Sequence, residues 1–154
     1  RELRSGFPPF GGMNNLLRYV RTPMVIFTTE DLVSSVWAMR ESLENATDVV
    51  EIDVRDFLSY PYADAYAQQI DVYNGMGLHQ PGEPVQVEES LLGGQKADFL
   101  KRAADLNPFV TDYFFWVDAD VFRGVRDMGR FAEWPVGETM LGIDPTKVLL
   151  ASTQ

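Results

Sequence analysis

The sequence predicts an α/β domain with a mostly parallel sheet flanked by helices. Unbroken apolar runs such as Pro23–Thr29 are typical of strands that are buried on both faces, as in a parallel sheet. These runs alternate with longer segments of helical pattern, in the order strand, helix, strand, helix, strand. Such alternation favours crossover connections that return the chain to the same sheet.

The amino-terminal third predicts a loop, a strand and a helix. Residues 1–21 are rich in Gly, Pro and Asn, which indicates a lead-in loop before a single domain over residues 22–154. The first strand is Pro23–Thr29, and the helix that follows spans Asp31–Glu44. Thr29 is the expected N-cap of this helix, because the acidic residues after it suit the first helical turn.

The middle of the chain predicts a strand, a mixed segment, a loop and a long helix. Val49–Val54 is the second strand, and the aromatic segment Asp56–Ile70 is expected to be partly helical. Gly75–Pro84 holds Gly and Pro at close spacing and predicts a loop. Val87–Leu106 predicts a helix that a Gly pair weakens. It ends at Asn107, because the proline that follows disfavours the helical conformation there.

Two further strands are predicted in the last third of the chain. The third strand is Asp112–Val121, in which an aromatic run ends in "VDADV", and the fourth is Thr146–Thr153. The chain of 154 residues is long enough for one domain with a hydrophobic core, and hardly long enough for two.

Composition narrows the possible partners. The formal net charge of −10 repels phosphate backbones, so nucleic acid is not an expected partner. The absence of cysteine excludes disulfides and thiolate metal sites, but leaves the compartment unknown. No apolar run approaches the ~20 residues that span a bilayer, so we expect no membrane segment in this fragment. Because Arg1 is not a natural start, a missing upstream anchor would be compatible with the lumen of the secretory pathway.

Asp118 and Asp120 are the candidate metal ligands. Side chains two apart in a strand share a face, so both carboxylates could converge on one centre at the carboxyl end of the third strand. Close carboxylates repel each other, and a divalent cation would relieve that repulsion. Oxygen-only ligands suit Mg²⁺ or Mn²⁺. The alternative is a pair of exposed loop acids, one of which caps a following helix.

Two cations are expected on inner helix faces. Lys96 shares the helical spacing of apolar Leu92, Phe99, Leu100 and Ala103 in this sequence. Arg40 shares that of Val36 and Trp37. Structural ion pairs or snorkelling stems would explain both, and this is the favoured interpretation for Arg40. Lys96 is equally compatible with a phosphate contact.

The other candidate residues lie at strand ends and in loops. Thr28 and Thr29 follow the first strand, where nucleotides often dock, although helix capping explains Thr29 as well. Asp53 ends the second strand and could accept a hydrogen bond from a ribose hydroxyl, or it could be solvated. His79 is the only histidine, and its Gly/Pro-rich setting favours a surface loop.

Two blocks of the chain resemble the HtrL/YibB-like family, which is similar to type A glycosyltransferases. The blocks are "TPMVIFTTEDL" and "GGQKADFLKRAADLNPFVTDYFFWVDADVFR", with a looser match over residues 54–87. The resemblance implies the nucleotide-binding half of a type A glycosyltransferase-like fold, without the acceptor half. It also implies two ligands, Mn²⁺ or Mg²⁺ and a nucleotide-sugar. By this resemblance, Asp118 and Asp120 hold the metal and Thr28 lies near the nucleotide. Three further residues lie at motif positions of the family: Lys96, Asn107 and Arg123.

The expected function is transfer of a sugar from a nucleotide-sugar donor to an unknown glycan or protein acceptor. Many relatives carry a glycine at the position of Asp120, so this chain has a fuller D-x-D than they do. No catalytic base can be named, and this segment alone is expected to show no turnover. One alternative is a non-catalytic module that binds a nucleotide or a glycan. A less favoured one is a haloacid dehalogenase-type phosphatase, with Asp118 as nucleophile and Asp120 as acid/base.

Overall fold

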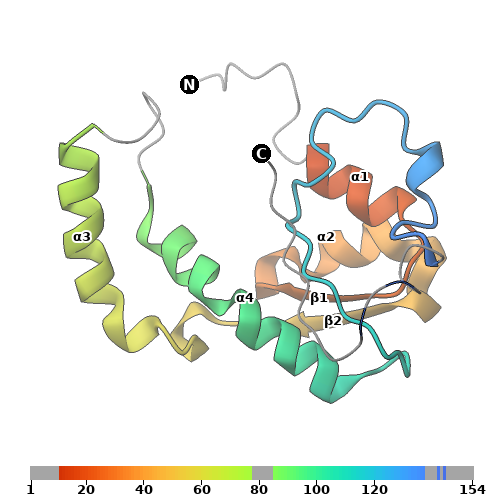
Figure 1. The fold of residues 1–154 in the computed structure, drawn as a ribbon, viewed down its shortest axis with the longest axis horizontal. Helices are drawn as coiled ribbons and strands as arrows, with labels where there is room; N and C mark the ends of the chain where they lie inside the picture. Colours follow the sequence, from red (N-terminus) through yellow and green to blue (C-terminus); the bar gives the residue numbers. More distant parts are fainter. Residues whose placement is uncertain (1–10, 78–84, 138–141, 143, 145–154) are drawn as a thin grey trace.

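The protein is a mixed α/β structure built around a small parallel sheet. The computed structural model describes residues 11–77, 85–137, 142 and 144. Helices flank two parallel strands, β1 (Met24–Thr28) and β2 (Thr47–Glu51), as Figure 1 shows. The α/β class and the parallel pairing predicted from the sequence are both confirmed.

The two strands belong to one crossover unit. Helix α2 (Glu30–Arg40) and the 3-10 helix η1 (Glu41–Ala46) carry the chain from the end of β1 to the start of β2. The register pairs Met24 with Thr47 and Thr28 with Glu51, so both strands end at the same edge of the sheet. The amide of Ile52 donates to the Thr28 carbonyl at 2.9 Å and extends this pairing by one step.

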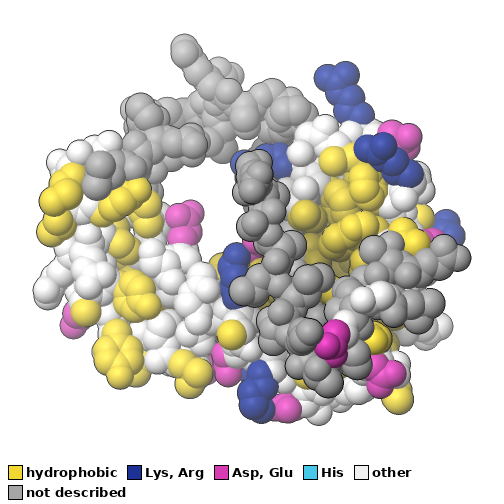
Figure 2. All heavy atoms as spheres, viewed as in Figure 1, with side chains coloured by type: hydrophobic (Ala, Val, Ile, Leu, Met, Phe, Trp, Pro, Cys, Tyr) yellow, Lys and Arg dark blue, Asp and Glu magenta, His cyan; other side chains and the backbone are white. Residues whose placement is uncertain are grey.

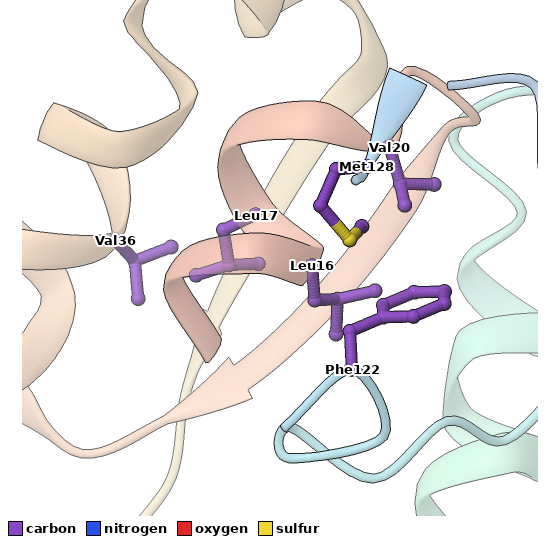
Figure 3. Close-up of a cluster of buried hydrophobic side chains, with 6 residues drawn as sticks. All are labelled: Leu16, Leu17, Val20, Val36, Phe122 and Met128. Atoms are coloured by element: carbon purple, nitrogen blue, oxygen red, sulfur yellow. The ribbon is translucent and has the colours of Figure 1, made fainter. Parts of the chain in front are cut away.

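Helix α1 (Gly11–Tyr19) replaces part of the predicted lead-in loop, so the loop prediction is wrong for these residues. Residues 1–10 lie outside the described part of the chain. A helix this short is marginal by itself and depends on tertiary packing, which local composition does not reveal. Figure 3 shows that packing: the core brings together side chains from α1 and the residue after it, from α2 and from beyond residue 120, namely Leu16, Leu17, Val20, Val36, Phe122 and Met128.

Beyond β2 the chain forms two short 3-10 helices, η2 (Val54–Asp56) and η3 (Tyr60–Tyr62), and then helix α3 (Ala63–Gly75). The predicted partial helix is thus confirmed, although α3 runs further than Ile70. Most of the predicted loop Gly75–Pro84 lies outside the described residues. In Figure 1 α3 stands apart from the sheet, and Figure 2 shows apolar side chains over its surface.

Helix α4 (Val87–Leu106) has the bounds that the sequence predicts. Asn107 ends it in the left-handed conformation, with φ 37°. The helix buries Leu91, Gln95, Phe99 and Ala103, whereas Leu92 is 42% exposed and Lys96 only partly buried. The predicted inner face is therefore right for Phe99 and Ala103 but wrong by one position in the first half of the helix, where Gln95 is buried and Lys96 lies beside it. One residue turns a helix by about 100°, so neighbouring apolar positions leave the phase ambiguous.

The segment Asp112–Val121 is not a paired strand, which corrects the third-strand prediction. Within the described ranges only β1 and β2 pair. The segment instead packs through its side chains: Trp116 and Val117 join the two hydrophobic clusters that also hold residues of β1. The apolar run therefore indicated burial correctly, but burial does not decide which backbone groups pair. The predicted fourth strand lies outside the described residues.

Over residues 11–77 and 85–137, no helix is long and apolar enough to cross a bilayer.

Candidate functional site

Asp118 and Asp120 lie where the extended segment after α4 enters a turn. The Val121 amide donates to the Asp118 carbonyl at 3.1 Å, and the Arg123 amide donates to the Asp120 carbonyl at 2.8 Å. Residues 118–125 form what we call the acidic turn. Because Asp120 lies in a turn, the strand geometry that predicted a shared face for the two carboxylates does not apply. Each carboxylate contacts its own cation instead.

Asp118 accepts hydrogen bonds from two side chains. The Lys96 ammonium of α4 lies 2.7 Å from Oδ1 and 3.1 Å from Oδ2, and the Trp116 indole N–H donates to Oδ1 at 3.0 Å. These bonds, that of Lys96 foremost, lower the pKa of Asp118 below its ordinary value. The ammonium also lies 5.7 Å from the centre of the Trp116 ring, within the range of a cation–π contact.

Asp120 is paired with Arg123, whose guanidinium lies 3.3 Å from Oδ2. Both side chains are mostly exposed to solvent. Together with Lys96 of α4, the acidic turn thus forms a cluster of two carboxylates and two cations in direct contact, and the net charge of this cluster is close to zero. In such a balanced cluster the two carboxylates could take a metal ion as their partner, and the two side-chain cations could then take phosphate oxygens as theirs.

A column of aromatic rings connects the sheet to the acidic turn. Phe27 of β1 stacks on Phe99 of α4 at 4.7 Å between ring centres, and Phe99 stacks on Trp116 at 5.9 Å. Phe57 closes the column with an edge contact to Phe99. The column therefore fixes Trp116, and with it the indole N–H that holds Asp118, against the end of β1.

A known family covers most of these elements. Residues 10–131 match the family described as "Bacterial protein of unknown function (HtrL_YibB)". The chain belongs to the HtrL/YibB family. This membership confirms the family predicted from the sequence, and the matched range includes α1, the sheet, α4 and the acidic turn. No match was found among curated proteins or among solved structures.

The two threonines predicted at the nucleotide position of this HtrL/YibB chain differ in exposure. Thr28 ends β1 and is buried, while Thr29 is exposed and takes the extended N-cap conformation before α2. The Thr29 hydroxyl donates to the Asp31 carboxylate at 2.6 Å and caps no helical amide. Thr29 therefore fits the N-cap position in its backbone only.

Asp53 and Asn107 both have local structural roles. Asp53 caps the amide of Arg55 at 2.9 Å and is ion-paired with the guanidinium of the same residue. The Asn107 side chain accepts from the Thr111 amide at 2.9 Å and donates to the Thr111 carbonyl at 3.1 Å. Asn107 thus shapes the turn between α4 and the segment that leads to Asp118. His79 lies outside the described residues.

The bonds from Arg55 lower the pKa of Asp53 to about 2, and Arg55→Met should return it towards the ordinary value near ~3.9. Because the pKa is lowered, the pair stabilises the folded protein at pH values above the ordinary pKa of an aspartate. This contribution to stability is lost as the pH falls through about 2. A carboxyl-detected NMR titration of both proteins checks this. An Asp53 pKa that is equal in the two proteins would show that Arg55 does not hold this carboxylate in solution.

Sequence reasoning missed the residues that hold the site from behind. Gly12 and Asn15 of α1 contact the backbone of the acidic turn, more than a hundred positions along the chain. Gln95 is buried in α4 and bonds the Leu58 amide and the Ser59 hydroxyl. The sequence signalled the role of Gly12 only through the pair Gly11 and Gly12, and such a pair also fits a loop.

Proposed function

We propose that this protein is a metal-dependent glycosyltransferase of the nucleotide-sugar type. It would bind its donor through Mn²⁺ or Mg²⁺ at Asp118 and Asp120 and transfer the sugar to a glycan or protein acceptor. The observation that carries the proposal is the acidic turn itself, in which Lys96 and Arg123 already balance the two carboxylates.

The residues fit a metal that arrives with its substrate. Carboxylate oxygens are hard ligands that suit Mg²⁺ and Mn²⁺. In the part of the chain that the structure describes, no group of three or more Asp, Glu, His or Cys side chains could hold a metal. Mg²⁺ commonly binds one or two carboxylates together with substrate phosphates and water. The pair Asp118 and Asp120 supplies the protein share of such a site.

A metal–diphosphate complex complements the charges of the acidic turn on both sides. Asp118 and Asp120 would hold the cation in place of their present contacts with Lys96 and Arg123. The side chains of Lys96 and Arg123 would then contact phosphate oxygens, which would replace the carboxylates as their negatively charged partners. Every charged group would thus have an opposite partner both before this exchange and after it is complete.

The metal supplies charge neutralisation of the diphosphate leaving group when it is bound. Lys96 and Arg123 would add to this electrostatic stabilisation as charge develops on the departing phosphates. Trp116 holds the Asp118 carboxylate in a fixed orientation through its indole N–H, and the aromatic column holds Trp116. These residues thereby fix the leaving group in place, while the residue that activates the acceptor is not identified among them.

The proposal predicts that metal and nucleotide strengthen each other's binding. Calorimetric titration of Mn²⁺ into this chain, with and without uridine or guanosine diphosphate, should show tighter metal binding when the right nucleotide is present. The reason is that each ligand compensates the charge of the other, and such coupling is reciprocal. Equal metal affinities in all conditions would contradict a shared site.

Asp120→Asn should weaken this coupled Mn²⁺ binding by at least about tenfold, since even outer groups around a metal site commonly contribute that much. Asp112→Asn is the matched control, because Asp112 is exposed and lies before the acidic turn. Asp127 would be a poorer control, since it accepts a hydrogen bond from the Gly129 amide at 3.0 Å. Equal losses in both variants would point to a general charge effect. Product analysis of the full-length protein with a panel of nucleotide-sugars then separates transfer from binding alone.

A further inference from the structure

Helix α1 contacts the acidic turn at a point where no side chain fits. A Cβ atom built on Gly12 would lie 2.4 Å from the Cα atom of Asp120 and 2.8 Å from its carbonyl carbon and oxygen. Real Cβ atoms essentially never come closer than 3.0 Å to such atoms, so a side chain at position 12 must displace the backbone of Asp120. Glycine is thus required here for close approach of two backbone segments.

A second residue of α1 holds the far side of the same turn. The Asn15 side-chain amide donates to the Phe122 carbonyl at 3.0 Å and to the Val125 carbonyl at 2.9 Å. The Phe122 ring is buried against Leu16 and its neighbours, as Figure 3 shows. The turn is therefore fixed to one face of α1 by close approach, by hydrogen bonds and by an apolar anchor.

All of these contacts act on the backbone or on Phe122. The carboxylates of Asp118 and Asp120 contact Lys96 and Arg123 instead, so α1 holds the backbone of the turn rather than its carboxylates. Because the turn amides of Val121 and Arg123 bond the carbonyls of the two aspartates, a shift of the Asp120 backbone changes the separation of the two carboxylates.

We propose that Gly12 and Asn15 are positioning residues for the acidic turn, and that α1 thereby sets the relative position of Asp118 and Asp120, the two residues that would hold the cation. The second part of this inference rests on the proposed function, whereas the first part does not. Helix α1 would then shape the binding site through the backbone of the turn.

Gly12→Ala tests the close approach, with Gly93→Ala as its control. Both glycines lie in helices, but a Cβ on Gly93 would meet nothing within 4 Å. We expect Gly12→Ala to speed native-state hydrogen exchange of the Val121 and Arg123 amides by about tenfold or more, as expected where the structure opens locally. We also expect it to weaken Mn²⁺ binding in the presence of a nucleoside diphosphate by roughly 10- to 100-fold. Gly93→Ala should change neither.

Asn15→Ala provides a second test that adds no bulk, in case Gly12→Ala does not fold. Asn14→Ala, one position away on the same helix, leaves the Phe122 and Val125 carbonyls with their donor and is its control. The inference is supported if the Val121 and Arg123 amides exchange faster in Asn15→Ala and not in Asn14→Ala. Unchanged exchange in Asn15→Ala and in folded Gly12→Ala overturns it, whether or not the protein binds Mn²⁺. Should the unmodified protein bind no Mn²⁺, the proposed function fails, and the exchange data still decide the role of α1.

Discussion

Replacing Arg40 with methionine is expected to lower the free energy of unfolding by about 3–5 kcal/mol, because several carbonyls would lose their donor at about 1–3 kcal/mol for each one that stays buried. Arg40 has no exposed surface, and its guanidinium donates to one hydroxyl and four carbonyls. These acceptors lie in and just after α1, before β1, and where η1 meets β2: Leu17, Val20, Thr22, Ala46 and Thr47. Arg40 thus joins three segments of the chain through their backbone.

In Arg40→Met, the stability lost with the hydrogen bonds is expected to exceed the stability gained by removing a buried charge. Burial lowers the pKa of Arg40, which reflects the cost of desolvating its charge, and methionine would remove that cost. Methionine would also leave several buried carbonyls without a donor, at about 1–3 kcal/mol for each one that water does not reach. With four carbonyls involved, the second effect is larger.

Urea denaturation of the variant and of an Arg18→Met control measures this difference. Arg18 is exposed on α1 and bonds only within its own helix, to Asn14, among the contacts the structure gives it. Its replacement should therefore change the free energy of unfolding by no more than about 0.5 kcal/mol. A loss below about 1 kcal/mol in Arg40→Met would mean that water or a rearranged backbone satisfies the carbonyls.

The sequence could predict elements whose side chains carry the signal. The run Pro23–Thr29 has the unbroken apolar pattern of a buried strand, and β1 forms there. Helix α4 could be bounded because proline follows Asn107 and because its apolar spacing persists over twenty residues. Arg40 could be placed on an inner face of α2 for the same reason. Most of its hydrogen-bond partners are backbone carbonyls, however, and the side-chain pattern of a sequence does not predict which backbone carbonyls act as acceptors.

Other elements depend on contacts that are distant in the sequence. Gly11 and Gly12 lower helix propensity, and α1 forms because its apolar face packs on Phe122 and Met128. The run before Asp118 carries a strand-like pattern, yet within the described residues its backbone pairs with neither strand. The D-x-D of the candidate site could be found by its spacing alone. The role of α1 behind it could not, because a glycine chosen for close approach resembles a glycine in a loop.

Replacing Lys96 with methionine is expected to weaken nucleoside diphosphate binding in the presence of Mn²⁺ by about 10- to 100-fold, because a charge-assisted hydrogen bond contributes roughly 1.5–3 kcal/mol. The same change should hardly affect stability. The Lys96 and Asp118 side chains are 43% and 56% exposed, and ion pairs of such exposure contribute about 0–1 kcal/mol.

Lys101→Met is the matched control for this substitution. Lys101 lies on the same helix and is ion-paired with Asp105, with both side chains more exposed than those of Lys96 and Asp118. It removes the same charge from the protein without touching the acidic turn, so nucleotide affinity should not change. Melting temperature and nucleotide affinity are measured for both variants.

A third measurement separates a binding role from a simple ion pair. Without nucleotide, a metal that binds Asp118 must displace the Lys96 ammonium, which lies within 3.1 Å of both carboxylate oxygens. Lys96→Met should therefore bind Mn²⁺ alone more tightly than the unmodified protein, while it binds the nucleotide more weakly. A lysine that only pairs with Asp118 would produce the first effect without the second. A large fall in melting temperature with unchanged nucleotide affinity would contradict the proposal and make Lys96 a structural residue.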